Sequence, residues 1–414
     1  MEETDLASNP RLRPVEVFPV QMEGQELFCL RDPQSLAEQP IFLNRVLVFI
    51  VSRMDGTNSL RDIQVDFCRA TGEILPMEDL EGLVKQLDQH HYLESALFRS
   101  FYEAQVQEFR RASVRTACHA GSAYEANGPA LISQLNGLFT HPEGPGECKV
   151  SDAARPLRGL VSPHIDFARG GPTYAHAYRA LAEHPGADRF IIFGTCHNPM
   201  LQRFALTLKD YETPLGTAEV DREFVRRLAS KMQRDYFQDE FSHRGEHSIE
   251  FQAVWLKYTL KDWSDFKIVP ILVASFHDIC SQRTGVADDP EIQEMVTAIR
   301  EIMIEVPGRY CVIAGADLAH VGRRFGDPSG PTESLLHQVE QEDRLFLERA
   351  VACDAEGVSD SIAADNDRRR VCGYPPIYMT LRCLEKADGS LLQYRQWTDL
   401  HAGAAVTYAA LAFY

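Results

Sequence analysis

The sequence predicts an α/β protein whose central sheet is mostly parallel or mixed and is flanked by helices, with a small α+β domain in front of it. Three observations lead to this prediction. Short apolar runs alternate with segments of helical periodicity through most of the chain, which is typical of α/β domains. Several of these runs end abruptly at a histidine or an aspartate. The N-terminal region differs, because two short strand-like runs are followed there by three short helical segments.

Composition narrows the class of protein. The chain has 414 residues, 44% hydrophobic and 25% charged, so a sizeable core and more than one domain are expected. The net charge of −18 argues against nucleic acid or a membrane surface as partner, because phosphate groups require clustered Lys and Arg. We interpret the compact basic run over 365–370 as a solvated loop rather than a phosphate site. The 10 cysteines lack disulfide or zinc spacing, and the polar N-terminus is no signal peptide, so a cytoplasmic location is expected.

The chain is expected to have four parts. They are a disordered tail over 1–14, a small domain over 15–100, a linker helix over 101–115 and the α/β domain over 116–414. In the small domain, two strands flank a turn at 22–25, and helices are predicted over 41–54, 60–72 and 77–95. Asn58 or Ser59 is expected to cap the second of these helices. This order of elements is a winged-helix pattern.

The elements of the α/β domain follow from the alternation of apolar runs and helical periodicity. Strands are predicted over 157–162, 189–194, 203–209, 266–274, 309–315, 391–397 and 404–412. Helices are predicted over 129–139, 174–184, 221–232, 247–260, 291–305, 333–350 and 374–385. Gly170 and Gly171 are interpreted as a break before the second of these helices.

Three strand ends carry residues able to do chemistry, and ligands of open α/β sheets bind at that edge. His164 follows one apolar run and His197 follows another. A lone histidine there is usually structural, but two in matched positions favour a metal, because imidazole is the commonest transition-metal ligand. Cys372 would complete a His₂Cys set and leave coordination positions for substrate or water. Asp317 and His320 follow a third apolar run.

Two further pairs of residues are open to more than one interpretation. Asp317 would hold the imidazole of His320 in one tautomer and leave His320 as acid or base. Alternatively, Asp317 caps a helix and His320 lies in its first turn. His247 and Glu250 lie three residues apart on one helix face. We interpret them as pocket wall rather than ligands, because H-x-x-E without a following His misses the inverted-zincin pattern.

Six blocks in the second part of the chain together resemble the Memo family. They are RTACHAGSAYEANGPALISQL, LVSPHIDFARGG, FGTCHN, EHSIEFQ, GADLAHVGRRFGD and VCGYPP, and they occur in this order. The resemblance implies the fold of class III extradiol dioxygenases, which hold ferrous iron with two His and a Glu. It implies that His164 and His197 are metal ligands and that Cys372 stands in place of the dioxygenase carboxylate. It also implies that His320 is the acid or base of the pocket, with Asp317 as its neighbour.

Other positions follow or depart from the family pattern. His119 lies in the first block, which the family shares. Asp166 replaces a small residue, and it either adds a ligand or caps the next helix; we favour the cap. Asn198 follows the ligand where the family often has a second His. A sulfur ligand favours copper, zinc or redox-active iron over the oxygen-rich ferrous triad, and it is itself oxidisable.

With its N-terminal extension, the chain is similar to the AmmeMemoRadiSam system protein B family, which implies radical-SAM and AMMECR-type partner proteins. Residues 15–97 resemble PqqD-like domains, which implies a peptide held at a strand edge; a structural or dimerising appendage is the alternative. We expect a metalloprotein with ferrous iron or copper and redox, dioxygenase-like chemistry. A zinc hydrolase with His320 or Glu250 as base, and a non-catalytic binding adaptor, are the alternatives.

Overall fold

The structure, a computed structural model, describes residues 9–22, 24–34, 36–37, 39–147, 155–261, 265–282 and 285–414. The chain divides into two compact units, Met1–Arg111 and Ala112–Tyr414. Residues 1–8 of the predicted tail lie outside the described residues. Leu12 and Arg13, which the sequence assigned to that tail, are paired with the rest of the first unit. Their N–H groups donate to the carbonyls of Met54 at 2.7 Å and Tyr92 at 2.9 Å.

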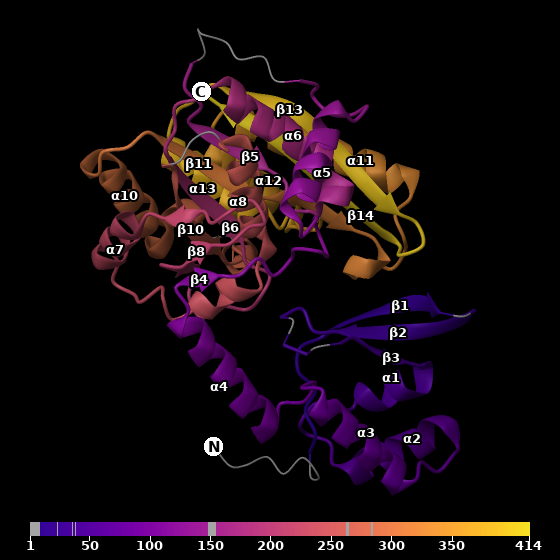
Figure 1. The fold of residues 1–414 in the computed structure, drawn as a ribbon. Coiled ribbons are helices and arrows are strands. Elements are labelled where there is room, and N and C mark those ends of the chain that lie inside the picture. Colours follow the sequence, from indigo (N-terminus) through magenta and orange to yellow (C-terminus); the bar gives the residue numbers. More distant parts are fainter. Residues whose placement is uncertain are drawn as a thin grey trace. The chain divides into compact units, whose positions relative to one another are not determined.

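In its described part, the first unit contains a three-stranded antiparallel sheet with helices (Figure 1). The strands are β1 (Glu16–Met22), β2 (Gln25–Arg31) and β3 (Ile41–Leu43), in that order across the sheet. The helices are α1 (Arg45–Val51), α2 (Leu60–Thr71), α3 (Met77–Gln89) and α4 (Ala96–Arg111). One apolar cluster fills this unit, with Ile63, Leu80, Tyr92 and Leu93 at most 1% exposed.

Side-chain caps explain where the first two helices of this unit, α1 and α2, begin. The predicted helix over 41–54 is divided into β3 and α1, because the Asn44 side chain accepts the N–H of Leu47 at 2.9 Å and starts the helix there. The predicted cap of α2 is confirmed as Ser59. Its hydroxyl accepts the Asp62 N–H while the Asp62 carboxylate accepts the Ser59 N–H, which is a capping box.

The second unit is an α/β domain with a mixed central sheet, which confirms the predicted fold class. Its nine-stranded sheet has the order β12-β14-β5-β11-β6-β10-β7, with β13 beside β14 and β9 beside β10. The adjacent strands β5, β11, β6 and β10 are parallel to one another. Their bounds are Gly159–Ser162, Tyr310–Gly315, Arg189–Thr195 and Lys267–Val273. The others are β7 (Phe204–Leu206), β9 (Glu219–Val220), β12 (Asp317–Val321), β13 (Gly389–Asp399) and β14 (Ala404–Phe413), and β4 (Val114–Arg115) pairs separately with β8 (Asp210–Tyr211).

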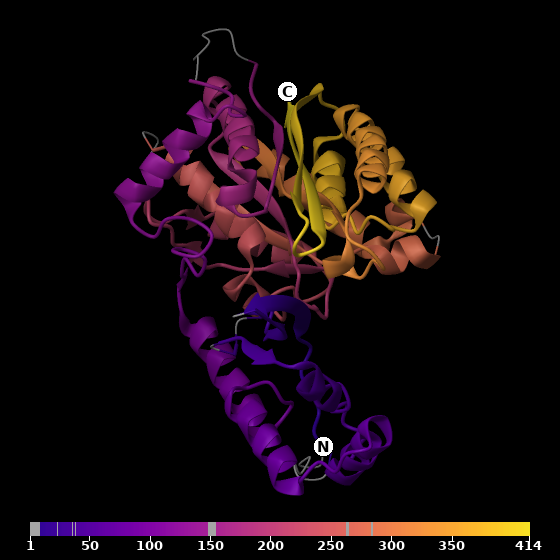
Figure 2. The same ribbon diagram turned by 90° about the vertical axis from the view of Figure 1, so that its right-hand side faces the viewer.

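Helices cover both faces of this sheet (Figure 2). One layer contains α5 (Gly128–Thr140), α6 (Phe167–Glu183) and α8 (His247–Thr259). The other contains α10 (Pro290–Glu305), α11 (Glu333–Val351), α12 (Ala355–Asp365) and α13 (Tyr374–Leu384). The shorter helices are α7 (Arg222–Lys231), α9 (His277–Gln282), η1 (Glu240–Arg244), η2 (Val286–Asp288) and η3 (Arg323–Phe325). Of the described helices, none is both long and apolar enough to cross a bilayer.

In the second unit, two predictions about secondary structure differ from the structure. The helix predicted over 174–184 begins at Phe167, because Gly170 and Gly171 lie inside α6 and do not break it. A Cβ on these glycines would lie within 2.4 Å of the Ile165 and Leu138 side chains, so they are required for close packing. The helical alternative for Asp317 and the residues after it is wrong, because they form β12, which pairs with β14.

The parallel strands bring three chain segments to one edge. Gly315, at the end of β11, lies opposite Ser162 of β5 on one side and opposite Gly194 of β6 on the other. The residues that follow these strands therefore emerge next to one another, which confirms that the three predicted strand ends share one edge.

Candidate metal centre

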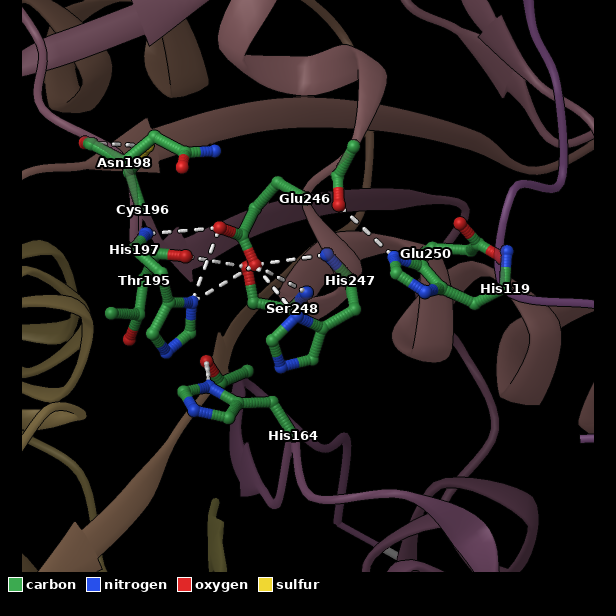
Figure 3. A network of polar contacts seen from close by, with 12 residues as sticks. His119, His164, Thr195, Cys196, His197, Asn198, Glu246, His247, Ser248 and Glu250 are labelled. Carbon is green, nitrogen blue, oxygen red and sulfur yellow. Dashed lines mark hydrogen bonds and ion pairs between the residues drawn. The ribbon is translucent and has the colours of Figure 1, made fainter. Parts of the chain in front are cut away.

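Three imidazoles meet at this edge (Figure 3). His164 follows β5, His197 follows β6, and His247 is the first residue of α8. One ring nitrogen from each lies within 4.8 Å of the others. The ring centroids are 5.0 Å apart for His164 and His197, 5.2 Å for His164 and His247, and 4.9 Å for His197 and His247. The predicted meeting of His164 with His197 is thus observed, and His247 joins them from a helix.

Helix α8 reaches the strand ends because two glycines leave room for it. A Cβ at Gly194 would lie 2.5 Å from the Ile249 side chain, and one at Gly315 would lie 2.5 Å from the Ser248 carbonyl oxygen. The Ser248 hydroxyl donates to the Thr195 carbonyl at 2.8 Å and fixes the helix start on β6. This contact places the side chain of His247 beside His197.

His164 is held in one orientation from both sides. Its N–H donates to Asp317 Oδ1 at 2.9 Å, and its Nδ1 lies 3.0 Å from the Gly315 carbonyl oxygen. A carbonyl only accepts, so Nδ1 carries the proton and Nε2 keeps its lone pair. Burial and the neighbouring His197 and His247 hold the pKa of His164 well below its usual value of 6.5, so the ring is neutral.

Glu246 links the other two imidazoles, although it is not among the site residues predicted from the sequence. Its carboxylate lies 3.1 Å from Nδ1 of His197 and 3.1 Å from Nδ1 of His247. Burial opposes ionisation of this carboxyl, but the two imidazoles outweigh it and hold the pKa of Glu246 well below 4.5. The signal in the sequence was a glutamate directly before a histidine at a helix start.

Cys372 lies next to the cluster formed by the three histidines, in contact with His164. Its Sγ is 3.3 Å from Nε2 of His164, and its carbonyl oxygen accepts a hydrogen bond from the Thr195 hydroxyl at 3.1 Å. Two donors bound to one small ion at about 2.1 Å for nitrogen and 2.3 Å for sulfur would be separated by a similar distance, roughly 3.5 Å. Burial and the nearby Asp317 raise the pKa of the Cys372 thiol well above 9.0 in the absence of a cation.

Asp317 and His320 are arranged differently from the expected pair. Asp317 Oδ1 accepts the backbone N–H groups of His164 and Ile165 at 2.9 and 3.2 Å. The Nδ1 of His320 lies 3.1 Å from the Leu318 carbonyl oxygen, so Leu318 rather than Asp317 orients that nitrogen. Burial lowers the pKa of His320 from 6.5 to about 4, although the nearby Asp317 opposes the change. His320 therefore carries a neutral ring whose Nε2 can accept a proton.

The basic run over 365–370 is part of this site's framework and not a solvated loop. Arg369 is 2% exposed and its guanidinium donates to Asp343 Oδ1 at 2.6 Å. The His320 N–H donates to the Arg369 carbonyl at 2.7 Å, and Arg370 Nη1 donates to the His320 carbonyl at 3.1 Å. Arg370 also adopts a left-handed φ of 52°. The run thus binds both the backbone N–H and the carbonyl of His320, and it ends two residues before Cys372.

A second group of ligand-type residues, Cys118, His119 and Glu250, lies close by. The His119 and His247 ring centroids are 5.6 Å apart. Both oxygens of Glu250 are already bonded: the Arg115 guanidinium and the Cys118 thiol donate to Oε2, and the His119 N–H and the Tyr124 hydroxyl donate to Oε1. The negative charge of Glu250 is therefore already paired with a permanent cation.

Asp166 performs the capping role that we favoured for it. Its carboxylate accepts the Arg169 N–H at 3.0 Å as the N-cap of α6, and it pairs with the Arg169 guanidinium at 2.6 Å. Both contacts direct the Asp166 carboxylate to Arg169 of α6, so they support the capping role and not the alternative role as a metal ligand.

The three imidazoles fit a transition metal by the chemistry of their nitrogens. Each Nδ1 faces an oxygen acceptor, either the Gly315 carbonyl or the Glu246 carboxylate. This arrangement favours the proton on Nδ1 and leaves Nε2 of a neutral ring for a metal ion, and partners of this kind are usual behind metal-binding histidines. The fold and this site define an α/β protein with an imidazole-rich candidate metal centre at the ligand-binding edge of its sheet.

Comparison with known proteins gives the family. The family model described as "Memo-like protein" matches residues 115–412. A MEMO1 family protein of Aquifex aeolicus is 28% identical over 403 residues, which cover 97% of this chain and 99% of the relative. A MEMO1 family protein of Methanopyrus kandleri is 30% identical over 308 residues, covering 72% of this chain and 98% of the relative. The chain belongs to the Memo-like family, and the Aquifex relative also matches the first unit.

Proposed function

We propose that the chain is a redox, dioxygenase-like metalloprotein that uses ferrous iron or copper at the edge where His164, His197 and His247 meet. The observation that carries this proposal is the set of three imidazoles whose Nδ1 atoms all face oxygen acceptors. His164 and His197 would hold the ion, together with Cys372, whose sulfur lies 3.3 Å from His164. Such an ion would supply one-electron redox chemistry toward dioxygen.

The residues around the centre would manage protons and access. His320 is neutral because burial lowers its pKa to about 4, and its Nδ1 faces the Leu318 carbonyl. Its Nε2 can therefore take a proton from a substrate hydroxyl and return it later. The side chain of His197 is 38% exposed, so a substrate would approach the centre from that side.

A zinc-dependent hydrolase is the second candidate. A set of three imidazoles is also typical of catalytic zinc sites that keep one position for water. His320 is the better base for this reaction, because the carboxylate oxygens of Glu250 are already bonded to Arg115 and Tyr124. These two partners also keep the pKa of Glu250 below 4.5. Burial raises that pKa, but the Arg115 guanidinium more than offsets the effect.

The proposal also includes partners. The chain would act with radical-SAM and AMMECR-type proteins, as a member of the AmmeMemoRadiSam system protein B family. The PqqD-like first unit would bind a peptide along β1, which is an edge strand of the described three-stranded sheet with β2 as its neighbour. An edge strand can accept a further strand through its backbone groups. A cytoplasmic location accords with this proposal.

Metal analysis of untagged protein made without air tests the choice of metal. Stoichiometric iron or copper, with dioxygen uptake in the presence of a reductant, is expected. Stoichiometric zinc with amide or ester turnover would favour the hydrolase. Absence of any stoichiometric metal, with partner binding unaffected by His320→Ala, would favour a non-catalytic adaptor.

A cobalt-substituted protein tests the sulfur ligand. Co²⁺ bound to a thiolate shows charge-transfer absorption in the near ultraviolet, and we expect this absorption to disappear in Cys372→Ser. Cys118→Ser is the matched control, because Cys118 belongs to the neighbouring group occupied by Arg115. Absorption that survives in Cys372→Ser would exclude Cys372 as a ligand and leave His247 as the third donor.

A further inference from the structure

Glu246 makes more contacts than the cap of a helix requires. As the N-cap of α8, it accepts the N–H groups of His247 at 2.9 Å and Ser248 at 3.2 Å. It also accepts the backbone N–H of His197 at 2.9 Å, and it contacts both imidazoles through their Nδ1 atoms. The residue is 3% exposed, so bulk solvent has little access to these contacts.

Glutamate is an unusual choice for a helix cap. Ser, Thr, Asp and Asn are preferred, because their short side chains reach the N–H groups of the first turn. The other described helices whose N-cap side chain accepts a backbone N–H follow this preference. Their caps are Asn44, Ser59, Ser95, Asn127, Asp166, Asp221, Asp289, Thr332 and Asp354. The additional methylene of Glu246 lets one carboxylate serve the helix start and the two rings together.

The chemistry of this carboxylate determines the state of both rings. An ionised carboxylate only accepts hydrogen bonds, so the nitrogen that faces it must carry the proton. Glu246 therefore favours the Nδ1–H tautomer of His197 and of His247 and leaves both Nε2 atoms with lone pairs. His164 reaches the same tautomer independently through the Gly315 carbonyl.

We propose that Glu246 is the positioning residue of the candidate metal centre, which fixes His197 and His247 together in the Nδ1–H tautomer so that both offer Nε2 to a metal ion. This inference rests on the proposed metal-binding function. It adds that the two rings are set before any ion arrives and that a single side chain sets both.

Nitrogen–proton NMR spectra of the imidazole rings in the metal-free, full-length protein test the proposal directly. The Nδ1–H tautomer is expected for His197 and His247 in the unsubstituted protein. In Glu246→Gln, one acceptor oxygen and one donor NH₂ replace two acceptors, so one of the two rings is expected to change to the Nε2–H tautomer. The affinity for Zn²⁺ should fall on the order of 10–100-fold, as is usual when the partner of a metal-binding histidine is lost.

Two further variants separate ring positioning from helix capping. Glu246→Asp keeps the charge and a preferred cap but is one methylene shorter, so it should retain folding stability and lose control of the tautomers. Asp354→Asn is the matched control, because Asp354 caps α12 through the Gly357 N–H at 2.9 Å. It should leave the imidazole spectra and the Zn²⁺ affinity unchanged.

The outcomes are distinguishable from those of the proposed function. An Nε2–H tautomer for either ring in the unsubstituted protein would overturn the inference, and so would Glu246→Asp and Glu246→Gln spectra and affinities equal to those of the unsubstituted protein. Tautomers that respond as expected in a protein that binds no Zn²⁺, iron or copper would support the role of Glu246 and overturn the metal-binding function.

Discussion

Glu246 and Glu250 lie one turn apart on α8, and both are buried carboxylates with a pKa below the usual value. Their partners differ. Glu246 contacts the imidazoles of His197 and His247, whereas Glu250 is paired with the guanidinium of Arg115. Glu250 belongs to one cluster of ligand-type residues, and Glu246 contacts two of the three histidines that form the other.

This difference shows why ligand-type residues alone do not define a metal site. The charge of Glu250 is compensated by a permanent cation, and an added metal ion would be repelled by Arg115 at short range. The carboxylate of Glu246 instead contacts two imidazoles that can act as ligands, so its negative charge can stabilise a cation bound to those rings. We therefore expect the proposed metal ion at the first cluster, and we expect the second cluster to contribute to folding stability.

The largest expected effect is the loss of metal from the first cluster alone. His164→Ala removes a ligand at the end of β5 and should abolish stoichiometric metal. His119→Ala, in the second cluster, should retain it, because His119 contacts Glu250 through its backbone N–H. Metal content measured by elemental analysis checks both variants. Full metal in His164→Ala would refute the ligand assignment.

The second cluster should instead respond in folding stability. Arg115→Met leaves Glu250 buried without its cation, and loss of one partner of a buried ion pair costs about 3–5 kcal/mol. Urea unfolding would measure this loss. Replacing both partners in Arg115→Met, Glu250→Gln should recover part of it. A cost below about 1 kcal/mol for Arg115→Met would contradict the assigned structural role.

A moderate effect is expected at Asp317. Its Oδ1 orients the loop that carries His164 through two N–H groups, and Asn keeps one acceptor oxygen but no charge. Asp317→Asn should weaken Co²⁺ binding on the order of 10–100-fold, measured by competition with a chelator. Asp221→Asn is the control, because Asp221 accepts the Phe224 N–H at the start of α7. An equal loss in both variants would indicate a general effect on folding.

The smallest effect is a difference between the responses of two single residues to acid, namely His320 near the first cluster and Glu250 in the second. Burial lowers the pKa of His320 from 6.5 to about 4, so on acidification His320 is protonated in the unfolded chain before it is protonated in the folded protein. Folding stability therefore decreases as the pH falls from 6.5 through about 4. Burial raises the pKa of Glu250, but Arg115 lowers it by more, so the net change is a decrease from 4.5. The contribution of Glu250 to folding stability is therefore complete above pH 4.5 and is lost only below that pH.

Urea unfolding of metal-free protein at stepwise pH distinguishes the two contributions. His320→Asn should reduce the decline that begins near pH 6.5, and Glu250→Gln should change only the decline that begins below pH 4.5. Identical pH profiles for the two variants would show that neither group titrates as described.

The sequence was sufficient for the features that depend on local pattern. The apolar runs before His164, His197 and Asp317 correspond to β5, β6 and β11, since strands buried on both faces are nearly continuous in hydrophobic residues. Parallel pairing then follows from the intervening helices. This information was enough to predict that the residues after those three strands share one edge.

The remaining features depend on contacts between distant residues. Arg115 was missed because its partner Glu250 lies 135 positions away, and nothing near Arg115 indicates a buried ion pair. Gly170 and Gly171 were misread because their role is close packing against Ile165 and Leu138. Glu246 was missed because the preferences for helix caps disfavour glutamate. The contacts that explain a glutamate at this position are with two imidazoles, one after β6 and one on α8, and the sequence does not show that these rings meet.

The position of β14 has a consequence for the order of events during synthesis. This last strand of the chain lies inside the sheet, between β12 and β5, and it is therefore needed to complete the edge that carries His164. The edge is therefore incomplete in any part of the chain that lacks residues 404–413. The segments that follow β5, β6 and β11 are expected to reach their final places only once β14 has joined the sheet.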